Sequence, residues 1–153
     1  MPSILIVCTA NICRSPVAEA LLKQKLQDRG EGWTVSSAGT LGINGWPPAP
    51  SSATMMAIRG IDITGYTSTA ISVELLNESD LTLCMEDSHV EYLHNFYPPA
   101  ASRILLLTEM VGEKRNIADP YGGPIQEFEH MVNEVEDILD RGLDRILELA
   151  TAL

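Results

Sequence analysis

The sequence predicts an α/β fold, a parallel twisted sheet with helices on both faces, and two observations support this. Short apolar runs alternate with amphipathic segments along the chain, which favours right-handed βαβ units. The first run, Ile4-Leu5-Ile6-Val7, is continuously apolar, as in a parallel strand covered on both faces. We therefore expect one three-layer domain over residues 1–153, because a chain of 153 residues fits one hydrophobic core.

The remaining elements follow from apolar runs, helical periodicity and turn residues. After the first strand, Ser15 and Pro16 are expected to be the N-cap and first position of a helix that closes at Gly30. Further strands are predicted at Trp33–Ser36, Leu81–Cys84 and Arg103–Leu107. Further helices are predicted near Ser51–Arg59, Val73–Asn77 and Asp87–Phe96.

The last third of the chain carries apolar residues at helical spacing from Phe128 to Ile146, which predicts one long amphipathic helix docked on the sheet. Gly142 lies in this pattern and is expected to weaken the helix by about 1 kcal/mol relative to alanine. The segments 40–50 and 113–124 are rich in Gly, Pro and Asn without periodicity, which predicts loops. Function in open α/β sheets lies at the carboxyl ends of strands, so the loop after the first strand is the first candidate site.

The composition argues against several classes of function. The formal net charge is −11 and no cluster of lysine or arginine offsets it, so we expect no binding to nucleic acid or to an anionic membrane. No apolar run approaches the roughly 20 residues that span a bilayer and no signal peptide begins at Met1, which predicts a cytoplasmic protein. The three cysteines form no CxxC pair and have no suitably spaced histidine, which argues against a disulfide framework and a metal site.

The loop after the first strand reads Cys8-Thr9-Ala10-Asn11-Ile12-Cys13-Arg14-Ser15-Pro16, with five residues between a cysteine and an arginine. Five residues can curl so that their backbone N–H groups point into one concavity, and the following helix adds positive potential. Such a nest suits phosphate, and an arginine at its end can hold two phosphoryl oxygens with a bidentate fork. Besides Arg14, the predicted phosphate-binding residues of this loop are Thr9, Ala10, Asn11, Ile12, Cys13 and Ser15.

Cys8 is expected at the bottom of this cradle, facing the phosphorus atom. Helix N-termini and neighbouring arginines stabilise the thiolate form of a cysteine, so we expect Cys8 to be ionised and nucleophilic. Attack on a phosphate ester would give a thiophosphate, with the charge on its oxygens held by the N–H groups and Arg14. Ser15 can stabilise the thiolate when it leaves again. The alternative is that Cys8 is a small buried hydrophobe and Arg14 an ordinary helix-start residue.

With these features the sequence resembles the low-molecular-weight protein tyrosine phosphatase family, whose signature is a Cys-x5-Arg-Ser-Pro loop close to the N-terminus. The similarity extends over essentially the whole chain and includes Ser37-Ala38-Gly39-Thr40, Asp80 with Leu83-Cys84-Met85, and Asp119-Pro120-Tyr121. The resemblance implies a four-stranded parallel sheet and a phosphocysteine at Cys8. It also implies phosphorylated proteins as substrates, with inorganic phosphate or oxyanion inhibitors in the loop. This chemistry requires neither a metal nor a cofactor.

The resemblance assigns roles to residues outside the loop as well. Asp119 is carried over as the acid that protonates the leaving oxygen and later activates water, whereas without the resemblance a turn aspartate would be the favoured interpretation. Asn11 is carried over as an organiser of the loop, with Ser37 as its partner. Tyr121 is carried over as one wall of the substrate slot. Trp46 is the candidate for the opposing wall, with a surface or core position as the alternative.

For the other two cysteines and the three histidines, the sequence predicts positions in the fold more than roles in catalysis. Cys13 lies five residues from Cys8, and oxidation could join the two in a reversible disulfide that protects Cys8, with simple packing as the alternative. Cys84 ends a predicted strand and is expected in the core. The residues that lack ligand spacing and are expected to face solvent or cap helices are His89, His94 and His130.

Three departures from the family pattern bear on the site. Ala10 stands where the family usually has glycine. An alanine is tolerated at this position if its φ is negative. The stretch Tyr66-Thr67-Ser68-Thr69 replaces the usual His-x-Ala-Arg, and Tyr66 can substitute through its hydroxyl. The late loop reads Asp-Pro-Tyr-Gly-Gly, which resembles a bacterial branch containing phosphoarginine phosphatases, where a threonine in the cradle favours phosphoarginine. The matching residue here is Ile12, whose apolar side chain suits an aromatic ring better, so phosphotyrosine is favoured.

A protein-arginine phosphatase with the same mechanism is therefore the main alternative. Arsenate reductases share the fold and loop in some bacteria but relay a disulfide through further cysteines, and no cysteine follows Cys84. A phosphate-binding module without catalysis would be expected to lack the nucleophile or the acid, yet Cys8, Arg14 and Asp119 are all present. Neither of the common glycine-rich nucleotide-binding motifs occurs.

Overall fold

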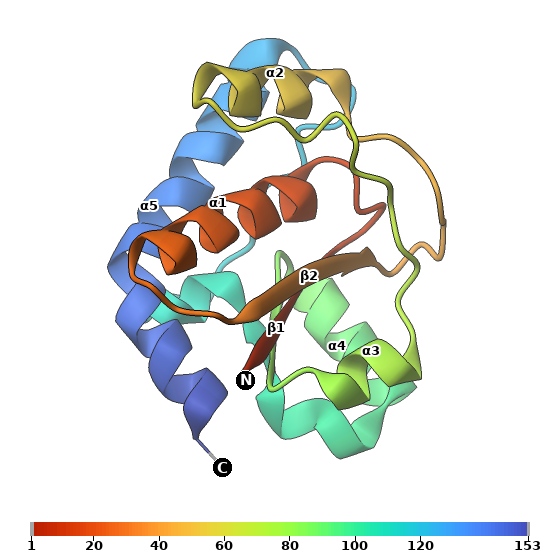
Figure 1. The fold of residues 1–153 in the computed structure, drawn as a ribbon. Coiled ribbons are helices and arrows are strands. Elements are labelled where there is room, and N and C mark those ends of the chain that lie inside the picture. The colour runs from red at the N-terminus through yellow and green to blue at the C-terminus, as the bar shows by residue number, and fades with distance from the viewer. Residues whose placement is uncertain (1, 153) are drawn as a thin grey trace.

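The computed structural model describes residues 2–152, so Met1 and Leu153, the two ends of the predicted domain, lie outside the described residues. Four parallel strands form a sheet in the order β2-β1-β3-β4 (Figure 1). Their bounds are Ser3–Cys8 for β1, Thr34–Gly39 for β2, Leu81–Cys84 for β3 and Ile104–Leu106 for β4. The prediction of a four-stranded parallel sheet is confirmed.

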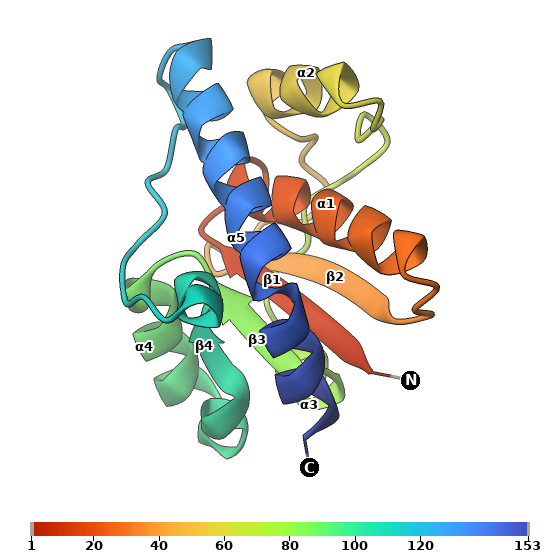
Figure 2. The ribbon, with the colours of Figure 1, turned by 90° about the vertical axis from the view of Figure 1, so that its left-hand side faces the viewer.

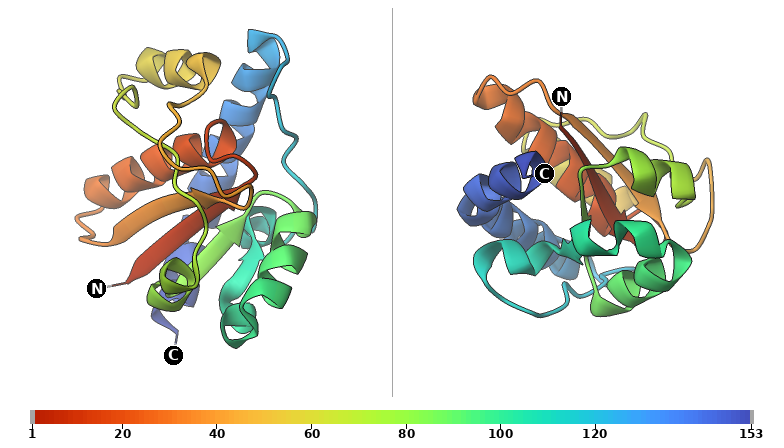
Figure 3. Two further views of the ribbon diagram at one scale, coloured as in Figure 1. Left: turned by 90° about the vertical axis from the view of Figure 1, so that its right-hand side faces the viewer. Right: turned by 90° about the horizontal axis from the view of Figure 1, so that it is seen from below.

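Helices form a layer on each face of this sheet, as predicted. One layer consists of α1 (Arg14–Asp28), α2 (Pro50–Ile58) and α5 (Ile125–Thr151), and Figure 2 shows α1 and α5 in front of the strands. The other consists of α3 (Val73–Glu78) and α4 (Asp87–Phe96), which the views of Figure 3 place on the opposite side. Within residues 2–152, none of the helices combines the length and the apolar composition needed to cross a bilayer.

The central strand β1 contributes side chains to both hydrophobic cores. Ile4 and Ile6 lie in the larger core, which includes residues of α1 and α5, whereas Leu5 and Val7 lie in the smaller core with residues of α3 and α4. All four side chains are fully buried. This explains why the strand is continuously apolar instead of alternating between apolar and polar residues.

The order of the strands determines where a site can form. β2 pairs with one edge of β1, and the chain then returns to pair β3 with the other edge. The connections that leave β1 and β3 therefore run to opposite faces, and such a switch point opens a crevice at the carboxyl end of the sheet. Cys8 is the last residue of β1 and lies at this switch point.

The start of α1 differs from the prediction. The N-cap is Cys13 instead of Ser15, its side chain makes no capping hydrogen bond, and Pro16 lies within the first turn. Ser15 does not act as a cap because its hydroxyl bonds to Cys8 and Asn11 in the preceding loop. Pro16 is tolerated there because the first N–H groups of a helix have no partner within the helix.

Other boundaries shift by a few residues. β2 extends to Gly39 instead of ending at Ser36, because its last residues continue to pair with β1 up to Cys8. β4 is shorter than predicted, because two 3-10 helices that the sequence did not reveal flank it, η1 (Pro98–Arg103) and η2 (Leu107–Val111). The helices α2, α3 and α4 agree with their predicted bounds to within one residue.

Gly142 has a packing role that its helix propensity conceals. A Cβ atom at this position would lie 2.8 Å from the Cβ atom of Met110 and 3.1 Å from the Met110 carbonyl oxygen. These atoms belong to or directly adjoin the backbone of η2 and cannot move away cheaply. The absence of a side chain therefore lets α5 approach η2, an advantage that offsets the propensity cost expected from the sequence.

We expect Gly142→Val to lower the free energy of unfolding by about 1–3 kcal/mol, because the added side chain overpacks the contact with Met110. Chemical denaturation of the variant and of Arg141→Val, an exposed neighbour on the same helix, provides the measurement. The control places the same side chain at an exposed position of α5, without the clash, and a loss of stability in Gly142→Val cannot come from helix propensity because valine has a higher propensity than glycine. Equal stability of the two variants would contradict the packing role.

Candidate active site

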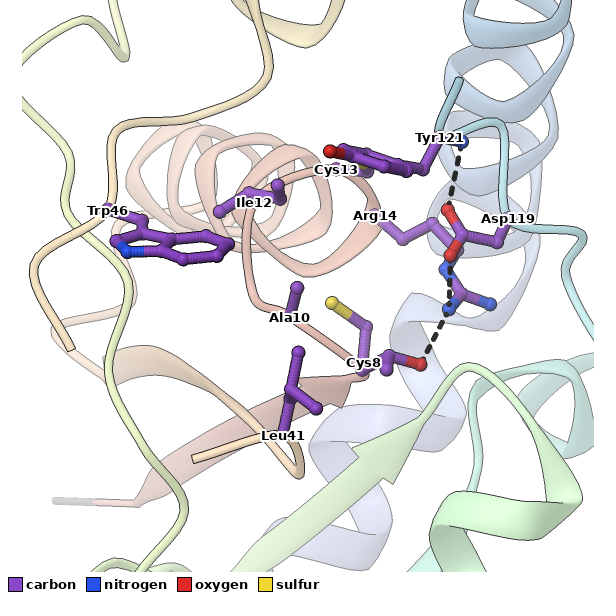
Figure 4. A pocket seen from close by; sticks show the side chains of 10 residues that line it. Cys8, Ala10, Ile12, Cys13, Arg14, Leu41, Trp46, Asp119 and Tyr121 are labelled. Carbon is purple, nitrogen blue, oxygen red and sulfur yellow. Dashed lines mark hydrogen bonds and ion pairs between the residues drawn. The ribbon is translucent and has the colours of Figure 1, made fainter. Parts of the chain in front are cut away.

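A cavity of about 230 Å³ opens where β1 ends and α1 begins (Figure 4). Its wall contains Cys8, Arg14 and Asp119, the three residues that the sequence analysis proposed for catalysis. Asn11 and Ser15 are not part of this wall but are fully buried and contact the sulfur of Cys8. The wall also holds Thr9, Ala10, Ile12, Cys13, Trp46 and Tyr121, as expected, and Leu41, which was not predicted.

The sulfur of Cys8 is surrounded by hydrogen-bond donors. The backbone N–H of Asn11 donates to it at 3.2 Å, and the hydroxyl of Ser15 lies at 2.9 Å. The cysteine itself is nearly fully buried at the end of β1, so few water molecules can solvate a negative charge on it. These two groups are placed to donate hydrogen bonds to the sulfur and so to stabilise such a charge.

Asn11 holds the loop in its curled form. Among the described residues it is the only non-glycine residue with a positive φ, at 62°, a conformation that asparagine tolerates better than most residues. Its Nδ2 donates to the hydroxyls of Ser15 at 2.6 Å and Ser37 at 2.9 Å, and its Oδ1 accepts the backbone N–H of Thr69 at 2.9 Å. The predicted contact between Asn11 and Ser37 is thereby confirmed, and the surrounding bonds stabilise the strained backbone.

The hydrogen-bond network continues behind Ser37. Its hydroxyl donates to Oε1 of the mostly buried Glu19 at 2.5 Å. Because Ser37 has a single hydroxyl hydrogen, the hydroxyl of Tyr66, 2.7 Å away, must donate to Ser37. Burial raises the pKa of Tyr66, so this hydrogen is retained at neutral pH. The hydroxyl of Tyr66 thus contacts Ser37, the partner of Asn11, and its support of the loop stays a prediction.

The loop also depends on the last residue of β2. A Cβ atom at Gly39 would lie 2.6 Å from the carbonyl oxygen of Thr9, 2.9 Å from the carbonyl carbon of Ala10 and 3.0 Å from the backbone nitrogen of Asn11. All three are backbone atoms, so only glycine allows the strand and the loop to approach this closely. Ala10 itself has a negative φ, the condition under which its methyl group was expected to be accepted in place of a glycine.

Arg14 is buried to 99 % and its guanidinium connects three segments. Its Nη1 donates to Oε2 of Glu86 at 2.5 Å and to the carbonyl oxygen of Ile117 at 2.8 Å. Its Nη2 donates to the hydroxyl of Thr9 at 3.3 Å and lies 3.6 Å from Oδ2 of Asp119. Its Nε is the only buried side-chain nitrogen or oxygen in residues 2–152 without a hydrogen-bond partner, which leaves a donor in the wall of the cavity for an anion.

The loop that carries Asp119 is tied to the end of β3. The N–H of Ile117 donates to the carbonyl oxygen of Met85 at 2.9 Å, while Arg14 binds the Ile117 carbonyl from the other side. Asn116 accepts the N–H of Asp87 at the start of α4 at 2.8 Å. Asp119 is therefore held near the cavity by the backbone of Ile117 and the side chain of Asn116, two and three residues before it.

Two aromatic side chains lie on opposite sides of the cavity above Cys8 (Figure 4). Tyr121 is 68 % exposed and follows Asp119, whose Oδ1 accepts the Tyr121 N–H at 3.1 Å. Trp46 is 48 % exposed, and its backbone is anchored by Ser68. The Ser68 hydroxyl accepts the backbone N–H of Trp46 at 3.0 Å, and the backbone N–H of Ser68 donates to the Trp46 carbonyl at 2.8 Å. The structure thus places Trp46 in the wall of the cavity and not in the core.

His89 takes one of its two predicted positions, that of a helix cap, but is buried instead of exposed. It caps α4, because its Nδ1 accepts the backbone N–H of Glu86, but it is 96 % buried and its Nε2 lies 2.9 Å from the hydroxyl of Thr9. Burial first, and then the charge of Arg14, lower its pKa to about 4 against the opposing carboxylates of Glu86, Asp119 and Asp87. The contacts that Glu86 and His89 make with Arg14 and Thr9 were not predicted, although both residues follow β3 at the edge of the sheet where function is expected.

The other two cysteines are free thiols in this structure. Burial, with smaller contributions from Asp119 and Cys8, raises the pKa of Cys13 to about 12, so Cys13 is a protonated thiol beside Cys8 at neutral pH. Burial also raises the pKa of Cys84, which lies in the core as predicted. The reversible disulfide between Cys8 and Cys13 stays a prediction.

The fold and the Cys-x5-Arg loop define a class of cysteine-dependent phosphatases, and comparison with known proteins identifies the branch. Residues 3–149 match the family model of the low molecular weight phosphotyrosine protein phosphatases. The chain is 35 % identical over 147 residues to the probable low molecular weight protein-tyrosine-phosphatase EpsP of Ralstonia nicotianae, covering 96 % of this chain and 97 % of EpsP. The chain therefore belongs to the low molecular weight phosphotyrosine protein phosphatase family.

Other similarities extend the comparison. A protein-arginine-phosphatase of Geobacillus stearothermophilus is 31 % identical to this chain over 144 residues, which cover 94 % of this chain and 95 % of the relative. The low molecular weight protein tyrosine phosphatase from T. tengcongensis has a TM-score of 0.90 at 32 % identity, covering 95 % of this chain and 99 % of its own. Wzb of Vibrio vulnificus, in complex with benzylphosphonate, has a TM-score of 0.86 at 28 % identity, and the match covers 94 % of this chain and 98 % of the Wzb chain.

We expect Gly39→Ala to abolish most of the phosphatase activity and to destabilise the protein, because the new methyl group would overlap the backbone of residues 9–11. Gly65→Ala is the matched control, since a Cβ atom there has nothing within 4 Å and its φ is not in the left-handed region. Activity on an aryl phosphate and the thermal unfolding midpoint are measured for both. A fully active Gly39→Ala variant would show that the close approach is not needed.

His89 is expected to make stability depend on pH. Its pKa in the folded protein, about 4, lies below its ordinary value of 6.5, so between these values the unfolded state binds a proton that the folded state does not. This contribution is complete above pH 6.5 and is lost as the pH falls through 4. Thermal unfolding at pH 7.0 and 4.5 should therefore show a smaller loss for His89→Gln than for the natural protein, whereas parallel losses would contradict the assignment.

Proposed function

We propose that this protein hydrolyses phosphotyrosine in proteins through a phosphocysteine on Cys8. One observation carries the proposal: a sulfur held by two donors, a buried arginine with an unpartnered Nε and a carboxylate lie together in one cavity between two aromatic rings. Each part matches one requirement of phosphoryl transfer, namely a nucleophile, a positive charge for the transferred group and an acid for the leaving group.

In the first step the thiolate of Cys8 attacks the phosphorus atom of the substrate. An S–P bond forms while the P–O bond to the tyrosine breaks, and Asp119 gives its proton to the departing phenolic oxygen. Arg14 binds the equatorial oxygens through Nε and Nη2, as the charge spreads over them. The 3.6 Å between Arg14 Nη2 and Asp119 Oδ2 leaves the carboxyl group next to the phosphoryl site.

In the second step water replaces the sulfur. Asp119, now a carboxylate, removes a proton from the attacking water molecule, a P–O bond forms and the S–P bond breaks. Cys8 leaves as a thiolate, and the hydroxyl of Ser15 and the N–H of Asn11 stabilise that charge again. Inorganic phosphate is the product, and the enzyme returns to its starting state with the proton on Asp119.

The walls of the cavity favour an aromatic substrate. Trp46 and Tyr121 flank the mouth, and the side chains of Ala10, Ile12 and Leu41 add further apolar surface. A flat phenyl ring buries apolar area against such walls, whereas the guanidinium of phosphoarginine has several N–H donors that these side chains leave without partners. The relative from Geobacillus stearothermophilus, named a protein-arginine-phosphatase, supports phosphoarginine as the second candidate.

We extend the proposal to the molecules that the protein binds and to its location in the cell. Phosphorylated proteins are the proposed substrates, and phosphate or other oxyanions are the proposed competitive ligands; the benzylphosphonate complex of the Wzb relative supports this. The net charge of −11 argues against nucleic acids as partners. A cytoplasmic location is consistent with three cysteines that are free thiols.

Initial rates on a phosphotyrosine peptide and a phosphoarginine peptide of the same sequence provide the test, in buffer with a chelator and a thiol. We expect the natural protein to prefer phosphotyrosine, Cys8→Ser to be inactive, and Asp119→Ala to be slower by about 10²–10⁴. The loss in Asp119→Ala should be smaller on p-nitrophenyl phosphate, because its leaving oxygen needs protonation least. Asp28→Ala, an exposed aspartate at the end of α1, is the matched control.

The outcomes separate mechanism from substrate. A preference for phosphoarginine, with Cys8→Ser still inactive, would keep the mechanism and overturn the role assigned to the apolar side chain of Ile12. Full activity of Cys8→Ser would overturn the phosphocysteine intermediate, and an equal loss of Asp119→Ala on all leaving groups would overturn its role as the acid.

A further inference from the structure

The hydroxyl of Thr9 lies where two elements meet. Arg14 Nη2, at the start of α1, donates to Thr9 Oγ1 at 3.3 Å. His89 Nε2, in the first turn of α4, lies 2.9 Å from the same oxygen. Thr9 follows Cys8 directly and lines the cavity with it, so this junction lies beside the proposed phosphoryl site.

The hydrogen bond on the far side of the imidazole determines which nitrogen carries the proton. The backbone N–H of Glu86 donates to His89 Nδ1 at 3.2 Å, so Nδ1 must accept and has no proton. The neutral imidazole then carries its hydrogen on Nε2. His89 therefore donates to Thr9 Oγ1, and the direction of this bond follows from the capping box of α4.

Burial, together with the charge of Arg14, keeps the His89 ring neutral at neutral pH. Burial and the guanidinium of Arg14 lower the pKa of His89 to about 4, with Glu86, Asp87 and Asp119 acting in the opposite direction. A second proton would have to sit on Nδ1, where it would oppose the Glu86 N–H. The ring is thus a donor at Nε2 and an acceptor at Nδ1 at neutral pH.

Two accepted hydrogen bonds occupy both lone pairs of Thr9 Oγ1. The hydroxyl hydrogen of Thr9 cannot point to Arg14 or His89, since both are donors, and it is left for an acceptor on the cavity side. We propose that His89 is a positioning residue that orients the Thr9 hydroxyl, so that Thr9 donates a hydrogen bond to an oxygen of the bound phosphoryl group. This inference rests on the proposed function, because it assigns a further donor to the same anion.

The consequence is a phosphate cradle with a side-chain donor in addition to its backbone N–H groups and Arg14. If the partner at Nε2 became an acceptor, Thr9 would donate to it and the hydrogen would be withdrawn from the phosphate. Glutamine and glutamate make this comparison possible at position 89. Both can accept the Glu86 N–H and so retain the capping box, but only glutamine also offers an N–H to Thr9.

The experiment measures the dissociation constant of inorganic phosphate by calorimetry for the natural protein, Thr9→Val, His89→Gln, His89→Glu and the two double variants with Thr9→Val. We expect Thr9→Val to bind phosphate about tenfold more weakly and His89→Glu at least tenfold more weakly. His89→Gln should rescue most of that loss. In the Thr9→Val background, the dissociation constants of His89→Glu and His89→Gln should differ only through the charge of glutamate. The difference between the two variants should therefore be much smaller than it is with Thr9 present.

His94→Gln, on the same helix but outside the cavity, is the matched control and should bind phosphate like the natural protein. A merely structural role of His89 would lower the unfolding midpoint without any coupling to Thr9. The inference is overturned if Thr9→Val binds phosphate normally, or if glutamate and glutamine differ equally with and without the Thr9 hydroxyl. Phosphate binding requires no turnover, so a natural protein that does not bind phosphate would instead overturn the proposed function.

Discussion

The buried guanidinium of Arg14 is the interaction on which the rest of the site depends. A charge that is 99 % buried must be paired and hydrogen-bonded, and here Glu86 supplies the opposite charge while the carbonyl of Ile117 and the hydroxyl of Thr9 take further donors. Glu86 follows β3, Ile117 lies in the loop of residues 113–124, and Thr9 lies in the loop between β1 and α1. Satisfying one buried charge therefore brings together three segments that are far apart in the sequence and leaves one donor for an anion.

On the other side of Cys8, the strained backbone of Asn11 has a comparable role. Its positive φ turns an N–H towards the sulfur, and its side-chain amide is bonded to Ser15, Ser37 and Thr69. The strain persists because every polar atom of the amide has a partner. Tyr66 and Glu19 complete this network through Ser37, so the loop around the sulfur is tied to residues that do not line the cavity.

Much of the fold could be predicted from local sequence because its elements carry strong periodic signals. The continuous apolar run of β1 and the apolar face of α5 are visible without any tertiary information, and the bounds of α4 agree with the prediction. The two 3-10 helices around β4 were missed because each directly adjoins the apolar run of the strand and has about three residues per turn instead of the roughly 3.6 of an α-helix. The start of α1 was misplaced because the hydroxyl of Ser15, a typical cap, is used instead by the active-site loop.

The loop after β1 could be recognised as a candidate anion site from the sequence, because a cysteine and an arginine separated by five residues, between a buried strand and a helix, follow from the order of residues in one segment. Which distant residues complete the site follows from the fold. Gly39, Glu86 and His89 have no local pattern that reveals their role, because each acts through contacts across the sheet edge with the backbone or side chains of residues 9–14. Spacing along the chain encodes a loop, but contact across the sheet depends on how the strands are ordered and how closely they pack.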